Sequence, residues 1–296
     1  MIINPTPSLA RIVREVHRPL IALFVWDVIV TVTYYVLPFR APSLPLTLFG
    51  SGLALFLGLR DNAAYARWWE GRVLWGAMIN ASRSLSRATL SMIQGEDEQG
   101  ISLRRAIILR QTAYVNALRC QLRRQDPKPE VLRFLSADEA AEPLKFTNIA
   151  NGLLNGTGAR VRAALDERRI DTIQQAQLEQ VLIDISNAQG GMERLKNTPL
   201  PMQYRFFPAF FTRLFCILLP IGLVETLGWA TPVGSTLAGL MFLAVLAIGD
   251  DLVDPFANSV HDVPLSAMCR TIEIDLLQAI GDTPEPPVQQ VRGVLW

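Results

Sequence analysis

Three aspartates near the end of the chain have a spacing that could hold a divalent cation. Asp250, Asp251 and Asp254 form a DDxxD triplet. Such a triplet on a helix can hold Mg²⁺ and a diphosphate, because hard cations prefer carboxylate oxygens. The sequence has one copy of it, directly after an apolar run, where acids that end a membrane span have the same appearance. We favour the second interpretation, and a membrane-bound prenyltransferase that uses the triplet remains an alternative.

Other catalytic and metal-binding patterns are weak. His17 and His261 are the only histidines, and neither has a nucleophile near it in the sequence. Cys120, Cys216 and Cys269 lie far apart, so no CxxC pair suggests a metal or redox site. Proteins that bind nucleic acid usually have a basic surface, so a net charge of +1 argues against a nucleic-acid partner. We therefore expect no enzyme activity, no metal site, no cofactor and no nucleic-acid partner.

Apolar residues are gathered in two blocks, one near each end of the chain. Half of the residues are hydrophobic and 19% are charged. A helix needs about 20 apolar residues to cross the hydrocarbon layer of a bilayer. Four runs predict membrane spans, at residues 20–37, 44–59, 206–229 and 235–248. Arginines crowd the N-terminus and the central region but are absent from the turn at 228–234, which predicts that both termini are cytoplasmic in a multi-pass protein of the cell inner membrane.

Ionisable residues interrupt two of these runs. Asp27 lies in the first span, and Arg213 and Glu225 lie in the third. A charge in hydrocarbon is costly, so such residues usually have a partner or a function. We expect Asp27 and Glu225 to pair with polar groups on neighbouring helices, with a proton relay as the alternative. Arg213 should reach the cytoplasmic surface.

The region between the apolar blocks is charged and has the periodicity of helices. Apolar residues recur every three or four positions from 170 to 195, which predicts a helix there. Glycines and asparagines at 148–158 predict loops and short helices. We expect an all-α integral membrane protein in four parts: residues 1–63 with two spans, a cytoplasmic helical bundle at 64–205, two further spans at 206–249, and a cytoplasmic tail at 250–296.

A cluster of charged and aromatic residues follows the second span. A helix that leaves hydrocarbon should meet charge and then amphipathic aromatic rings, so the cluster predicts a membrane exit that continues into a soluble helix. The same residues resemble the signature that follows the second transmembrane helix in the bacterial branch of the bestrophin family. The residues that carry this resemblance are Asn62, Tyr65, Arg67, Trp68, Trp69, Glu70, Arg72 and Trp75.

The resemblance covers nearly the whole chain and implies a homopentameric ion channel. Its second helix would line a hydrophobic neck, built in the family by three apolar positions four residues apart. Here those positions are Ser51, Leu55 and Leu59. Such positions share one helix stripe, and apolar rings control permeation by excluding water. Because Ser51 is small and polar, we expect a wide or hydrated outer ring and a barrier at the two leucines.

The resemblance also bears on a second constriction and on the conducted ion. Family members commonly have an isoleucine constriction in the cytoplasmic bundle, for which Ile170 and Ile173 are the candidates. The implied ions are small and monovalent, chiefly chloride, although some bacterial members pass cations. The implied partners are further copies of this chain and the lipid bilayer. A secondary transporter is another alternative, but no inverted repeat of broken helices is evident.

Animal members of the family hold Ca²⁺ with a run of acids after a Pro-Phe pair. Here Pro255 and Phe256 are followed by residues of which only Asp262 is acidic. Because Ca²⁺ takes six or more oxygen ligands, we expect no activation by Ca²⁺.

Overall fold

The computed structural model describes residues 1, 9–37 and 42–296, and for residues 9–15 it describes the backbone only. Over these residues the chain is mostly helical and contains no strand, which confirms the expected helical class. The chain divides into two compact units, each described here by itself. We call them the apolar unit and the charged unit.

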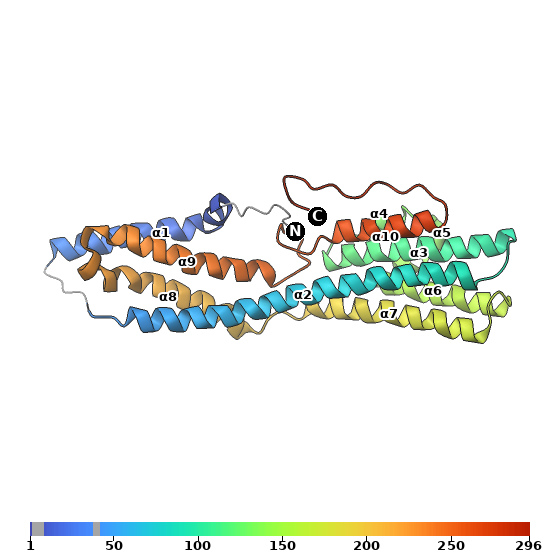
Figure 1. Ribbon diagram of the computed structural model, residues 1–296, viewed down its shortest axis with the longest axis horizontal. Helices are drawn as coiled ribbons and strands as arrows, with labels where there is room; N and C mark the ends of the chain where they lie inside the picture. The colour runs from blue at the N-terminus through green and yellow to red at the C-terminus, as the bar shows by residue number, and fades with distance from the viewer. Residues whose placement is uncertain (2–8, 38–41) are drawn as a thin grey trace. The chain divides into compact units, whose positions relative to one another are not determined.

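The apolar unit packs four helices around side chains of Leu and Phe. It consists of α1 (Leu9–Val36), the beginning of α2 (Leu46–Met92), α8 (Met202–Leu227) and α9 (Thr231–Leu252) (Figure 1). The 3₁₀ turn Gly228–Ala230 joins α8 to α9. It is shorter than the expected turn at 228–234 because α9 already begins at Thr231, with Pro232 in its first turn, where proline fits a helix. One core cluster of this unit joins α2 to α8 and α9 and consists of Leu53, Leu57, Phe215, Leu219 and Leu246. A second joins α1 to α8 and α9 and consists of Val16, Leu23, Cys216 and Leu243.

Two stretches of the described chain are long and apolar enough to cross a membrane. They are Val16–Val36 and Met202–Leu252, of which the second contains α8 and α9. The expected span at 44–59 is not among them, because it forms only the first part of α2, which continues into charged residues from Arg60 onward. Only 17% of the first window and 39% of the second are buried within the chain. The core helix of a water-soluble protein would be mostly buried, so these helices present apolar side chains that a single chain does not cover.

The charged unit is a bundle built on α3 (Glu98–Leu122). It also contains the end of α2, α6 (Ile149–Asp166), α7 (Thr172–Asn197) and α10 (Leu265–Ala279) (Figure 1). Shorter pieces are α4 (Lys128–Val131), α5 (Ala137–Ala141) and the 3₁₀ helix Pro143–Lys145. The α7 helix confirms the helix predicted at 170–195, but it starts two residues later, because Asp171 and Gln174 form a reciprocal capping box.

The expectation of loops and short helices at 148–158 is wrong, because one helix of 18 residues, α6, runs through this stretch. Asn148 caps the helix by accepting a hydrogen bond from the backbone N–H of Asn151. The glycines serve close packing instead of turns. A Cβ at Gly152 would crowd the ring of Phe146, and one at Gly156 would overlap the guanidinium of Arg110.

Candidate functional site

The first part of α2 has a buried face and an exposed face. Leu53 and Leu57 are buried in the core cluster with α8 and α9. Leu55 and Leu59, on the other side of the helix, are 69% and 58% exposed. Ser51 lies in the same exposed stripe. The three predicted neck positions therefore share one face, which a single chain leaves uncovered.

This exposed stripe offers apolar surface and little hydrogen bonding. The hydroxyl of Ser51 donates to the carbonyl oxygen of Leu48 at 3.1 Å, one turn earlier in the same helix. The leucines below it have no polar atoms beyond the helical backbone. Such a surface cannot bind an ion, but it can exclude water from a narrow passage.

The beginning of the exit signature lies in the apolar unit and combines packing with exposure. Arg67 Nε donates to the carbonyl oxygen of Val253 at 3.1 Å. The rings of Tyr65 and Trp68 stack with centroids 6.1 Å apart, and Asn62 is exposed. This part of the signature joins α2 to the end of α9 and presents aromatic surface at the end of the apolar segment, where rings of this kind favour a membrane–water interface.

The rest of the signature lies in the charged unit, where its residues contact different partners. Glu70 forms an ion pair with Arg194 of α7 at 2.5 Å. Arg72 contacts the sulfur of Met268 in α10 at 3.0 Å, Trp75 is fully buried, and Trp69 is exposed. Glu70 and Arg72 therefore attach α2 to two other helices.

Asp27 is fully buried and is satisfied by hydroxyl groups of α9. Its carboxylate accepts hydrogen bonds from Ser235 at 2.9 Å and from Thr236 at 2.8 Å. This pairing across helices is the one expected from the sequence. The expected pairing of Glu225 is wrong: its side chain is exposed on α8 and has no hydrogen-bonded partner among the described residues. Arg213 is also exposed on α8.

Two members of the aspartate triplet are engaged by cationic side chains. Asp250 forms an ion pair with Arg60, and Asp254 accepts a hydrogen bond from Lys196 Nζ at 2.7 Å. No group of three or more His, Cys, Asp or Glu side chains that could hold a metal ion occurs within residues 1, 9–37 and 42–296. The contacts of Asp250 and Asp254 favour ends of helices held by ion pairs over a diphosphate site.

The two candidates for the cytoplasmic constriction differ in exposure. Ile170 is 5% exposed, and Ile173, at the start of α7, is 69% exposed. Of these two residues, only Ile173 has a side chain that the single chain leaves exposed and that could line a passage.

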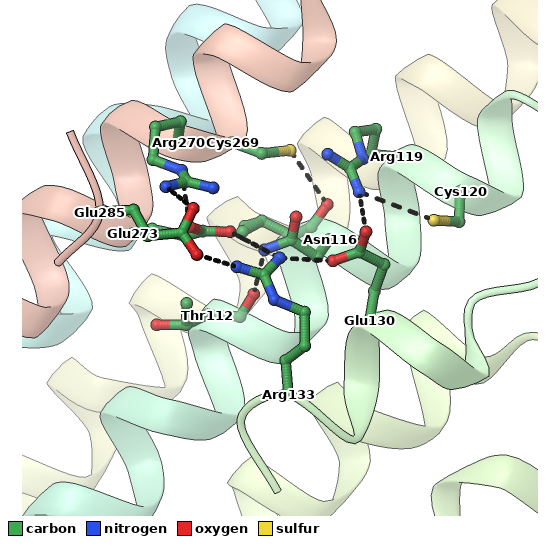
Figure 2. A network of polar contacts seen from close by, with 11 residues as sticks. Thr112, Asn116, Arg119, Cys120, Glu130, Arg133, Cys269, Arg270, Glu273 and Glu285 are labelled. Carbon is green, nitrogen blue, oxygen red and sulfur yellow. Dashed lines mark hydrogen bonds and ion pairs between the residues drawn. The ribbon is translucent and has the colours of Figure 1, made fainter. Parts of the chain in front are cut away.

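Sequence reasoning missed a network of buried and half-buried charges in the charged unit (Figure 2). At its centre, the Glu273 carboxylate accepts a hydrogen bond from Asn116 at 2.7 Å and forms ion pairs with Arg270 at 2.9 Å and Arg133 at 3.7 Å. Arg133 also pairs with Glu130 at 2.6 Å. Two local spacings gave a signal of it: Glu130 with Arg133, and Arg270 with Glu273, each three residues apart.

The edges of the network extend to Arg119, which pairs with Glu130 at 2.8 Å, and to Glu285, which pairs with Arg270 at 2.5 Å. Burial opposes ionisation of Glu130, but hydrogen bonds from Arg133 and Arg119 outweigh it, so the pKa of Glu130 is lowered. Burial raises the pKa of the nearby Cys269 thiol to about 12. Carboxylates held in ion pairs and a thiol that stays protonated are typical of groups that stabilise the fold, and not of catalytic groups.

Comparison with other proteins identifies the family of this chain. A family model described as "Bacterial/Fungal Bestrophin protein" matches residues 8–278. The chain belongs to this bestrophin family. The resemblance noted at the membrane-exit signature is thereby confirmed over most of the chain.

Several bestrophin relatives are similar over most of their length. Proteins named "voltage-dependent anion channel-forming protein" in Mesorhizobium japonicum and in Escherichia coli are 37% and 36% identical to this chain. The alignments cover 81% and 83% of this chain, and 76% and 79% of the relatives. The crystal structure of a bacterial bestrophin homologue from Klebsiella pneumoniae is 31% identical, with a TM-score of 0.84, and the match covers 90% of this chain and 98% of that one.

Proposed function

We propose that this bestrophin is an ion channel of the cell inner membrane, assembled from five copies of the chain, which passes small monovalent anions such as chloride. Curated relatives that share more than a third of their residues with it over the aligned length are named for forming anion channels. The apolar unit spans the bilayer, and the charged unit and both termini lie in the cytoplasm. We retain 1–63, 64–205, 206–249 and 250–296 as the proposed parts, although the apolar unit extends to Trp68 and takes in 199–253.

One observation carries the proposal: α2 exposes Leu55 and Leu59 while it buries Leu57. In a membrane such leucines face either lipid or other copies of the chain. Because they lie on one stripe just before the membrane exit, five α2 helices can bring them together around an axis. Two rings of leucine then form a neck that resists wetting, and Ser51 forms a more hydrated ring at its outer end.

The resemblance to bestrophins also implies a second constriction at the cytoplasmic end of the pathway. Ile173 is our proposal for this constriction, because it is exposed and Ile170 is buried. Both constrictions are apolar, so they act on the hydration of the ion. Neither provides a fixed charge that would choose between anions and cations, so the preference for anions rests on the relatives.

The reversal potential of the purified protein in a planar bilayer tests this function. Under a gradient of potassium chloride, an anion channel reverses near the chloride equilibrium potential, and a cation channel reverses near that of potassium. Current that reverses near the potassium value contradicts anion selectivity. Absence of ohmic current contradicts the channel itself and favours a transporter, or a prenyltransferase if pyrophosphate is released.

A further inference from the structure

Arg60 is a buried charge that directly follows the neck residue Leu59. Its side chain is 1% exposed, and its guanidinium is surrounded by oxygen acceptors. Nε donates to the carbonyl oxygen of Tyr204 at 3.1 Å, and one Nη donates to that of Leu246 at 3.1 Å. The other Nη pairs with the carboxylate of Asp250. The acceptors thus come from the beginning of α8 and the end of α9.

The acceptors around Arg60 are placed so that a planar, forked guanidinium can bind them all. Asp61 adds a further acceptor, with its Oδ1 at 3.3 Å from a guanidinium nitrogen. A Cβ at Gly249 would overlap both the Arg60 guanidinium and the Asp61 carboxylate, so glycine is needed for α9 to approach so closely. An arginine presents five donors in a fixed fork, whereas a lysine is a point charge that cannot reach all these acceptors at once.

Apolar packing alone does not determine how α2 is rotated about its axis. Its packed face carries Leu53 and Leu57, and its exposed face carries Leu55 and Leu59. In lipid, no hydrophobic force distinguishes a leucine that packs on a helix from one that faces hydrocarbon. A group with directional hydrogen bonds can make this distinction, because it has partners on one side only.

We propose that Arg60 is a positioning residue that fixes the rotation of α2, so that Leu55 and Leu59 face away from α8 and α9 and toward the channel axis. Arg60 follows Leu57 by three residues and shares its packed face, while Leu59 is about 100° away around the helix. Rotation of α2 would move the guanidinium away from the carbonyls of Tyr204 and Leu246. This inference rests on the proposed pentameric channel.

Disulfide cross-linking between copies tests the inference. With Leu59→Cys, neighbouring copies place thiols near one axis, and a mild oxidant such as copper phenanthroline should link them into dimers on a non-reducing gel. Leu57→Cys is the matched control on the buried face and should give little product. The protein without an introduced cysteine gives the background, since Cys120, Cys216 and Cys269 are all buried.

The contacts of Arg60 are then weakened in both the Leu59→Cys and the Leu57→Cys proteins. Arg60→Met and Gly249→Ala should each lower the ratio of Leu59→Cys to Leu57→Cys product about tenfold, and Arg60→Lys should give an intermediate value; a tenfold change corresponds to a bias of about 1.4 kcal/mol. Gly190→Ala, at a helical glycine with open space around it, should leave the ratio unchanged. If Arg60→Met does not assemble, Gly249→Ala decides the question.

The possible failures are distinguishable. If Leu59→Cys does not cross-link in the otherwise unchanged protein, the assembly around α2 is wrong. If it does cross-link and the ratio survives both Arg60→Met and Gly249→Ala, the pentamer stands and the role of Arg60 is overturned.

Discussion

At the scale of single residues, charge pairs between distant parts of the chain hold the charged unit together. Arg169 binds Asp97 through two parallel hydrogen bonds, of 2.7 and 2.8 Å, and it also pairs with Glu167 at 2.8 Å. The hydrogen bonds from Arg169 lower the pKa of Asp97 to about 2, and they raise the pKa of Arg169 in return. The pair joins the start of α3 to the segment just before α7.

This pair predicts a pH-dependent contribution to stability. The pKa of Asp97 is depressed on folding, so its contribution is fully present above about pH 4 and is lost as the pH falls toward 2. Asp97→Asn should therefore lower the thermal unfolding midpoint at pH 6 and make little difference near pH 2. Circular dichroism of the detergent-solubilised protein between these values measures this.

The control for this prediction is Asp138→Asn, at an exposed acid of α5. It should shift the midpoint less than Asp97→Asn at pH 6. A difference between parent and Asp97→Asn that stays constant down to pH 2 would contradict the assignment.

At the scale of elements, α2 carries both residues that pack the apolar unit and residues of the proposed channel neck. Its 47 residues begin in the apolar unit and continue into the charged unit without a break. Leu57 supports the packing of the apolar unit, and Leu55 and Leu59 are free for another role. The two faces should therefore respond differently to the same substitution.

Removal of the neck leucines should change conduction more than stability. Leu55→Ala and Leu59→Ala shorten exposed side chains, so each should widen the neck and raise the single-channel current or the open fraction, with a small shift in unfolding midpoint. Leu57→Ala leaves a cavity, which in protein cores costs about 2–5 kcal/mol, so it should mainly destabilise the protein. Single-channel recording and thermal unfolding together separate the two effects. The neck assignment is wrong if both exposed-face variants conduct and open as the parent does.

At the scale of the whole molecule, the acids of the segment after α9 bear on the expectation that Ca²⁺ does not activate this protein. The Asp262 carboxylate is buried and accepts hydrogen bonds from the backbone N–H and the hydroxyl of Ser259, both at 2.7 Å. Asp254 is engaged by Lys196. These two acids already have internal partners.

We accordingly predict that Ca²⁺ does not activate the channel. Macroscopic current in a bilayer should be the same when free Ca²⁺ on the cytoplasmic side is raised from nanomolar to micromolar concentrations. Asp262→Asn is the matched variant: it should lower stability through weaker hydrogen bonding to Ser259, and it should remain insensitive to Ca²⁺. A reproducible micromolar dependence in the parent that Asp262→Asn abolishes would reverse this conclusion.

Much of the architecture follows from local patterns in the chain. Runs of apolar residues, helical periodicity and the cluster from Asn62 to Trp75 are enough to predict helices, membrane segments and the family. The glycines of α6 were misinterpreted because glycine serves both turns and close packing, and only the neighbouring Phe146 and Arg110 distinguish the two. Those neighbours are brought there by the fold.

The sequence by itself determined that this protein is helical, that it has two apolar blocks and that it is a bestrophin. Each of these properties depends on residues that lie close together along the chain. Tertiary structure alone decided which face of α2 is left uncovered and which charges are paired. Arg60 meets Leu246 and Asp250 across 186 and 190 positions of the chain, and Asn116 meets Glu273 across 157. The spacing of residues along the chain cannot predict such contacts, since they form only when separate helices pack together.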